Sequence, residues 1–248
     1  MVTINVRPNR PEIKPSTRPS HKVRETQLYF YGPVMPDPLR QYSRPLAFPR
    51  NGWRRRIELF SPKLGRRLSL GSYEAYRTWL MVEANPAIET FTERPARVAG
   101  PGSAMIDFWV RLQEAPAGEF WLIDDRDAEE GDDRAREEGC GSDSLLHGLP
   151  VRFIHQSELQ AWRVPIANWS RIVPYLVSYR RFRAPVLEQA IVVYLNKPRA
   201  LDAIVERFSE YDQASVEASL FALLASGRVV SPDVALAPLS GATSFQRA

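Results

Sequence analysis

Three carboxylates lie at points of the sequence where a divalent metal ion could be bound. Glu74 is near the start of a segment with helical character, Asp107 lies within one apolar stretch, and Asp124 directly follows another. A carboxylate among strongly apolar neighbours is costly to bury unless a cation or a hydrogen-bond donor meets it. Carboxylate oxygens suit Mg²⁺ and Mn²⁺. The three acids are therefore candidate metal ligands.

The segment that carries Glu74 has the start and stop signals of a helix. Ser72 can cap the N-terminus, and Asn85-Pro86 would end the helix. These signals place Glu74 in the first helical turn.

The other two acids are associated with strand patterns. In residues 104–112, Ile, Phe, Val and Leu alternate with Asp107 and other side chains, which is the period of a strand. A second apolar strand, 120–123, leads directly into Asp124-Asp125-Arg126. An acid on one strand, followed by an acid, one further residue and a base at the end of the next strand, is a spacing typical of nuclease cores.

The order of these segments resembles that of the TnsA family, the endonuclease subunits of heteromeric transposases. A basic segment with Ser61, Lys63 and Arg66 leads into the helix with Glu74, and Asn85-Pro86 follows before the strand with Asp107. The resemblance covers roughly residues 55 to 180, with a looser match in the tail.

The resemblance implies a mixed sheet like that of restriction endonucleases. Glu74, Asp107 and Asp124 would hold Mg²⁺ or Mn²⁺, and Arg126 would clamp the scissile phosphate. The partners would be DNA at transposon ends and a DDE-type transposase that cuts the other strand.

The chain departs from the family at Asp124-Asp125-Arg126, where Glu or Gln, a variable residue and Lys are usual. A guanidinium suits phosphate clamping better than the polarisation of an attacking water. Two functions therefore remain open. One is a metal-dependent DNA endonuclease, and the other is a catalytically degenerate DNA-binding scaffold subunit of a transposition complex.

Residues 1–55 have the composition of an extended, basic, proline-rich arm. Residues 1–70 contain fifteen Lys or Arg against four acids, and ten prolines fall within the first 62. Such a proline density opposes regular helix or sheet, and basic side chains between aromatic ones suit a DNA backbone. The alternatives are a solubilising tail or docking onto an acidic protein. The predicted DNA-binding cations are Arg54, Arg55, Arg56, Lys63, Arg66 and Arg67.

The remainder of the predicted nuclease domain, 56–183, contains an acidic run, a strand and a helix. Residues 124–143 carry ten acids against three arginines, which indicates a solvated loop. A strand at 151–155 ends in His155, which is either a structural histidine or a catalytic base. A helix is expected from Ile166 to Phe182.

Residues 184–248 are predicted to form a small winged-helix-like domain. Three helices are expected at 185–194, 199–208 and 214–226, and a short strand at 228–231 follows Gly227. Around the third helix, Asp212, Ser215 and Glu217 lie where a DNA reader would carry cations. Contact with a protein is therefore favoured over contact with DNA for this domain.

Composition bounds the class of protein. The chain has 248 residues, of which 44% are apolar, and these suffice for a real core. One cysteine, Cys140, opposes a disulfide framework and a zinc site. No long apolar run is present. The expectation is a globular, cytoplasmic protein without a membrane span.

Overall fold

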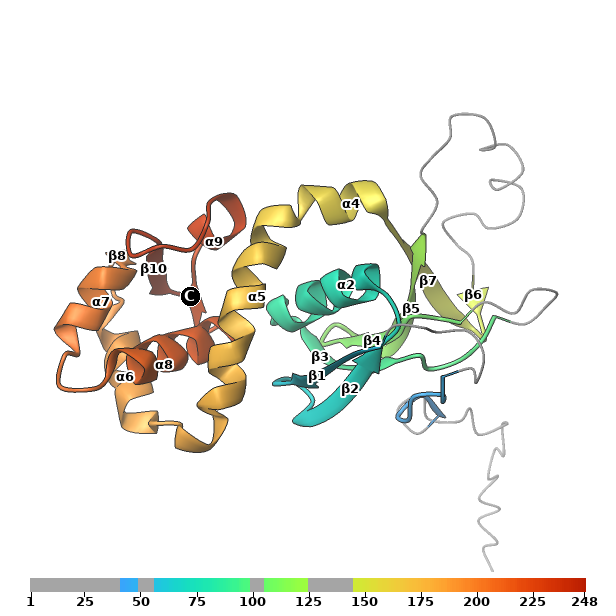
Figure 1. Cartoon of the computed structure of the whole chain (residues 1–248), viewed down its shortest axis with the longest axis horizontal. Coiled ribbons are helices and arrows are strands. Elements are labelled where there is room, and N and C mark those ends of the chain that lie inside the picture. Colours follow the sequence, from blue (N-terminus) through green and yellow to red (C-terminus); the bar gives the residue numbers. More distant parts are fainter. Residues whose placement is uncertain (1–40, 49–55, 99–104, 125–144) are drawn as a thin grey trace, which may run out of the picture. The chain divides into compact units, whose positions relative to one another are not determined.

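The first part of the structure is a mixed β-sheet. The computed structural model describes residues 41–48, 56–98, 105–124 and 145–248. Five strands form the sheet in the order β3-β4-β5-β7-β6 (Figure 1). Neighbouring strands run antiparallel, except that β5 and β7 are parallel. The strands are β3 (Ile88–Glu93), β4 (Phe108–Leu112), β5 (Ala115–Asp124), β6 (Leu145–Leu146) and β7 (Leu149–His155). The prediction of an α/β fold is confirmed at this level.

A hairpin of β1 (Ile57–Ser61) and β2 (Arg66–Leu70) precedes the sheet. Its turn includes Gly65, whose φ of 65° is a conformation that glycine adopts without steric cost. The sequence predicted only a basic lead-in here, so the hairpin is an element that was not predicted.

Helix α2 (Tyr73–Ala84) confirms the predicted start and stop signals. The Ser72 hydroxyl accepts a hydrogen bond from the backbone N–H of Ala75 at 3.0 Å, and Asn85 is the C-cap. Trp79, Leu80 and other apolar side chains of the helix are buried. The cap therefore sets the start of the helix and places Glu74 in its first turn.

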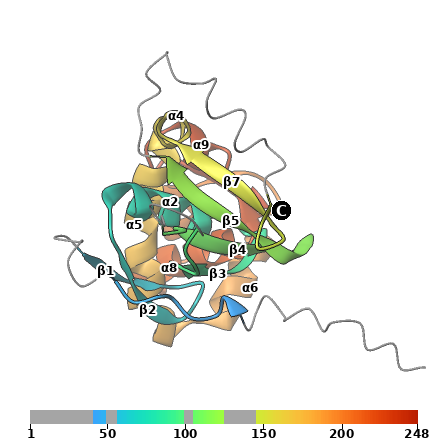
Figure 2. The same ribbon diagram turned by 90° about the vertical axis from the view of Figure 1, so that its right-hand side faces the viewer.

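The two faces of the sheet pack into different apolar clusters, and helix α2 lies on one of these faces (Figure 2). Phe108 belongs to the larger cluster, which also contains α2 residues, whereas Trp109 packs in a smaller cluster with Tyr42 and Phe120. Ile106 joins the cluster of Trp109, although strict alternation would place it with Phe108. The regular strand begins only at Phe108. Asp107 therefore directly precedes β4, and the prediction that it lies inside a strand is wrong.

Gly118 in β5 allows the close approach of β4, and replacing it with alanine is expected to destabilise the protein. Its φ is 77°, and an added Cβ would lie 2.5 Å from Nε1 of Trp109 and 2.8 Å from the carbonyl oxygen of Val110. Positive φ and overpacking should together lower the free energy of unfolding by about 2 to 4 kcal/mol. Urea denaturation of Gly118→Ala measures this loss.

Gly65→Ala is the matched control for that experiment. Its φ is also positive, but no atom lies within 4 Å of the position that an added Cβ would take. The loss should be limited to about 1 kcal/mol of backbone strain. Equal losses in the two variants would show that contact with Trp109 does not determine the role of Gly118.

The rest of the described chain is mainly helical. The long helix α5 contacts α2 and also contacts α8 and α9, so it joins the sheet part of the chain to the C-terminal helices. A small sheet in the order β8-β10-β9 accompanies the C-terminal helices. The elements are α4 (Gln156–Ala161), α5 (Arg163–Ser178), the 3₁₀ turn η1 (Arg180–Phe182), α6 (Pro185–Tyr194), β8 (Arg199–Ala200), α7 (Leu201–Arg207), α8 (Gln213–Ala225), β9 (Val229–Val230), α9 (Asp233–Leu236) and β10 (Ser244–Arg247).

Several predicted boundaries in this part need correction. The expected helix 166–182 begins earlier, at Arg163, and ends at Ser178 before η1. The expected helix 199–208 starts only at Leu201, because residues 199 and 200 pair with β10. Helix α6 begins and ends where predicted, with Pro185 in its first turn.

The acids around α8 have structural roles. Asp212 caps the helix by accepting a hydrogen bond from the Ser215 N–H at 2.9 Å. Glu217 is buried and accepts a hydrogen bond from the Gln213 side chain at 2.6 Å. Capping explains an acid at the start of this helix without any ligand.

The described residues from Gln41 onward belong to one compact unit. A single buried cluster contains residues of both parts, such as Val82 of α2 and Phe221 of α8. The boundary between residues 183 and 184 stays a prediction. No helix within the described ranges is long and apolar enough to cross a membrane.

Candidate functional site

Asp107 and Asp124 lie at the same end of two neighbouring strands. Asp107 directly precedes β4, Asp124 ends β5, and the antiparallel register pairs Phe108 with Trp121. One carboxylate oxygen of Asp107, Oδ2, accepts the backbone N–H of Ile123 at 2.8 Å. Asp107 is thereby bound to the residue that precedes Asp124. Two of the three predicted metal ligands therefore share one edge of the sheet.

His155 lies at this edge as well. It is the last residue of β7 and the parallel register partner of Asp124. Its Nδ1 is 3.7 Å from Oδ2 of Asp124, and its side chain is 60% exposed. Whether His155 is a structural histidine or a catalytic base stays a prediction. The edge therefore presents an imidazole beside the acids.

Within the described residues, the structure does not bring Glu74 into this group of side chains. Glu74 is half-buried in the first turn of α2. Arg126 lies outside the described residues. Within residues 41–48, 56–98, 105–124 and 145–248, no three His, Cys, Asp or Glu side chains are gathered as a metal-binding group. Two carboxylates at one edge have the donor chemistry that Mg²⁺ requires, so the fit of the described residues to a metal is partial.

The predicted DNA-binding cations differ in their surroundings. Arg66 forms two hydrogen bonds with the buried carboxylate of Glu93, at 2.9 and 2.6 Å. Arg56 lies 4.8 Å from the centre of the Phe48 ring, and Arg67 is exposed. Arg54 and Arg55 lie outside the described residues. Arg56 and Arg67 are the described members whose surroundings best suit contact with a phosphate.

Lys63 is directed into the protein. Its Nζ donates hydrogen bonds to the backbone carbonyls of Asn85, at 2.6 Å, and Ile88, at 2.9 Å. The first of these carbonyls belongs to the C-cap of α2, where a cation also interacts favourably with the helix dipole. Lys63 therefore connects the hairpin turn to the end of α2.

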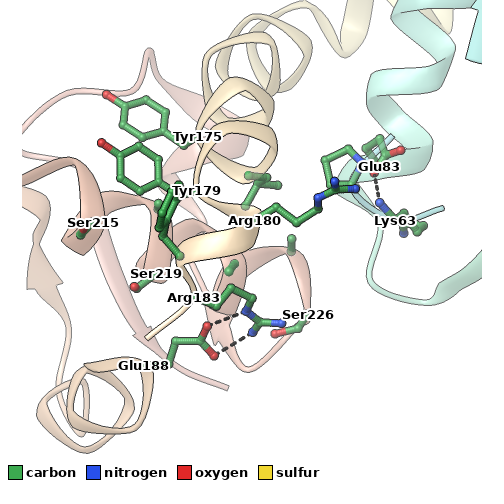
Figure 3. Close-up of a pocket in the computed structure, with 16 residues that line it drawn as sticks. Lys63, Glu83, Tyr175, Tyr179, Arg180, Arg183, Glu188, Ser215, Ser219 and Ser226 are labelled. Carbon is green, nitrogen blue, oxygen red and sulfur yellow. Dashed lines mark hydrogen bonds and ion pairs between the residues drawn. The ribbon is translucent and has the colours of Figure 1, made fainter. Parts of the chain in front are cut away.

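A buried carboxylate, Glu83, completes this connection, and its role was not predicted from the sequence. It accepts hydrogen bonds from the Ser61 hydroxyl and from the Trp79 indole at 3.0 Å. It also accepts one from the backbone N–H of Lys63 at 3.2 Å (Figure 3). Glu83 is only 2% exposed. A charged residue near the end of an amphipathic helix gives no sequence signal of burial, because two of its three donors, Ser61 and Lys63, come from a distant turn.

Burial lowers the pKa of Lys63 to about 8, from an ordinary value of 10.5, and the charge of Glu83 opposes part of that shift. Burial raises the pKa of Glu83, while its hydrogen bonds and the charge of Lys63 act in the opposite direction. The ammonium of Lys63 is therefore less favourable in the folded state than in the unfolded chain.

The stability advantage of the wild type over Lys63→Met is expected to grow as the pH rises from about 8 toward 10.5. Between these values the unfolded chain binds more protons at Lys63 than the folded chain, so stability increases with pH. Urea denaturation of both proteins across this range measures the difference. An advantage that is constant or shrinks with pH would contradict the inferred environment of Lys63.

A cavity of about 260 Å³ lies beside this network (Figure 3). It is bounded by the hairpin turn and by residues of α5, η1, α6 and α8. Arg183 on its wall forms two hydrogen bonds of 2.8 Å with Glu188. Arg180 lies 4.3 Å from the centre of the Phe60 ring. The cavity therefore has mixed charges on its wall.

No known protein-family profile matches the chain, and no curated protein matches its sequence.

Proposed function

We propose that this chain is a metal-dependent DNA endonuclease subunit of a heteromeric transposase, similar to TnsA, that cuts DNA at transposon ends. The observation that carries the proposal is the placement of Asp107 and Asp124 at one edge of neighbouring strands, joined by the hydrogen bond from Ile123. Acids at adjacent strand ends are the arrangement that the sequence spacing predicts for a nuclease site.

The topology also supports this proposal. Antiparallel β4 and β5, followed by a parallel β7 and packed with α2, suit a restriction-endonuclease-like core. The order α6, β8, α7, α8, β9, α9, β10 suits a winged helix with a short helix between its last two strands. Neither likeness by itself identifies a function.

In the proposed reaction, Glu74, Asp107 and Asp124 would hold Mg²⁺ or Mn²⁺. Such a metal would activate water as the nucleophile and stabilise charge on the scissile phosphate. Asp107 is oriented by the Ile123 N–H, which fixes its carboxylate at the edge. Arg126 contacts the phosphate, and a DDE-type transposase acts on the other strand.

The second candidate is a scaffold subunit that binds DNA without cutting it. The same hydrogen bond favours it, because Asp107 joins the edge to β5 with no metal required. The basic arm and Arg67 would still contact phosphates. The two candidates therefore differ in chemistry and share a location on DNA.

A nicking assay separates these functions. Transposon-end DNA, the DDE-type partner and the chain are incubated with Mg²⁺ and, in parallel, with a chelator. Strand-specific nicks that require both the chain and Mg²⁺ support the endonuclease. DNA binding without such nicks, in the presence of an active partner, supports the scaffold.

A further inference from the structure

Helix α6 is apolar on two opposite faces. Leu187, Ile191 and Val192 are buried on the side that packs against α8. Val186 and Val193 face outward, at 78% and 63% exposed. The helix also carries Glu188 and Gln189, so it is not apolar all round, but exposed valines opposite the buried face are unusual on a helix that faces only water. The outer face of α6 therefore has the composition of a contact surface.

The exposed valines border an open groove of about 910 Å³, which we name the α6 groove. Its lining comes from α6, from β8 and the loop before it, and from the end of α7. Val186 and Val193 are about two helical turns apart, so they form an apolar strip along α6 beside this concave surface.

Two arginines give this groove its charge. The Arg199 guanidinium lies 4.9 Å from the Tyr194 ring centre, and that of Arg207 lies 5.5 Å from the Phe208 ring centre. Within the described part of the chain, neither arginine forms an ion pair, and Nε of Arg199 is buried without a hydrogen-bond partner. The groove is thus complementary to carboxylates placed beside an aliphatic strip.

The chain's own segments do not have this chemistry. The arm of residues 1–55 is basic and would be repelled by the arginines. The run 124–143 is acidic but contains no aliphatic side chain larger than alanine. A second copy docked through the same groove would bring like charges together across a two-fold axis.

We propose that the α6 groove binds an amphipathic segment of another protein, with aliphatic side chains on one face and carboxylates along its edge. The aliphatic side chains cover Val186 and Val193, and the carboxylates meet Arg199 and Arg207. Helices commonly dock into grooves in this way. The inference is independent of the proposed nuclease chemistry, because the groove shares no residue with the acidic edge.

Two synthetic peptides test this proposal with the full chain. Both have the same leucine face, and one carries glutamates where the other carries lysines. Fluorescence anisotropy should show saturable binding of the glutamate peptide. The affinity for the lysine peptide should be lower by about fivefold or more. Equal affinities, or no binding of the glutamate peptide, would overturn the proposal.

Surface variants locate the binding and exclude general stickiness. Val186→Ser combined with Val193→Ser should weaken the glutamate peptide by about tenfold or more. Leu236→Ser, which changes another exposed aliphatic residue, at 77% exposure on α9, should leave its affinity unchanged. The opposite ranking of these variants would overturn the proposal.

A charge reversal should increase the affinity for the lysine peptide, and misfolding would not cause such an increase. Arg207→Glu should shift the preference toward the lysine peptide. An unchanged preference would contradict the role of the arginine. Sedimentation velocity tests whether a second copy of the chain occupies the groove. If the wild type self-associates and Val193→Ser does not, the groove binds a second copy and the proposed partner is overturned.

Discussion

Asparagine in place of Asp107 is expected to reduce Mg²⁺-dependent nicking of transposon-end DNA by roughly a thousandfold. The change removes a negative charge from the proposed metal site. Metal-assisted stabilisation of a phosphoryl transition state is worth several kcal/mol, and about 1.4 kcal/mol corresponds to a factor of ten. The measurement is a gel assay of strand-specific nicks with the partner transposase present.

The folded structure should tolerate this change. The carboxamide oxygen that Asp107→Asn introduces can still accept the N–H of Ile123, which the wild-type carboxylate accepts at 2.8 Å. The free energy of unfolding without metal should therefore change by less than about 1 kcal/mol. Asp107→Ala removes the acceptor too, so it should lose both stability and nicking.

Glu114→Gln is the matched control. Glu114 is exposed in the turn between β4 and β5, at the opposite end of these strands from Asp107. The same loss of charge there should leave nicking unchanged. If Asp107→Asn nicks as fast as the wild type, Asp107 is not a metal ligand and its role is structural.

Metal binding can be separated from chemistry in the same variants. Mn²⁺ should raise the melting temperature of the wild type, because a ligand that binds only the folded state stabilises it. The rise should be absent in Asp107→Asn and present in Glu114→Gln. A rise of equal size in all three proteins would place the metal elsewhere.

The sequence was sufficient for elements with strong local signals. Ser72 and Asn85-Pro86 mark α2, and Pro185 marks the start of α6, because caps and proline act within one turn. The strands at 120–123 and 151–155 were recognisable from their apolar composition. These elements bring Asp124 and His155 to one edge, and that pairing could not be read from the sequence.

The missed features depend on contacts between distant residues. The alternation around Asp107 was read as one strand, but Ile106 packs in a different cluster from Phe108, so the regular strand begins later. The basic segment after residue 56 suggested DNA contacts, and the structure adds that Lys63 and Arg66 have partners inside the protein, at Asn85, Ile88 and Glu93. Charge composition shows how many cations are present and does not show which of them have internal partners.

Leucine in place of Glu83 is expected to lower the free energy of unfolding by about 3 to 5 kcal/mol. Three donors lose their acceptor: the Ser61 hydroxyl, the backbone N–H of Lys63 and the Trp79 indole. Each buried donor left without a partner costs roughly 1 to 3 kcal/mol. The burial of leucine in place of a carboxylate offsets part of this loss, so the net effect falls below the sum.

Urea denaturation at neutral pH measures the change, with two comparisons. Glu83→Gln keeps one acceptor oxygen and should lose less stability than Glu83→Leu. Glu89→Leu changes a carboxylate that pairs with Arg111 at 2.5 Å but is 54% exposed, so its loss should stay below about 1 kcal/mol. If Glu83→Leu is no less stable than Glu89→Leu, the buried network does not hold the hairpin turn to α2. The hairpin would then be held mainly by the apolar contacts of Leu68 and Leu70, which are almost completely buried in the main cluster.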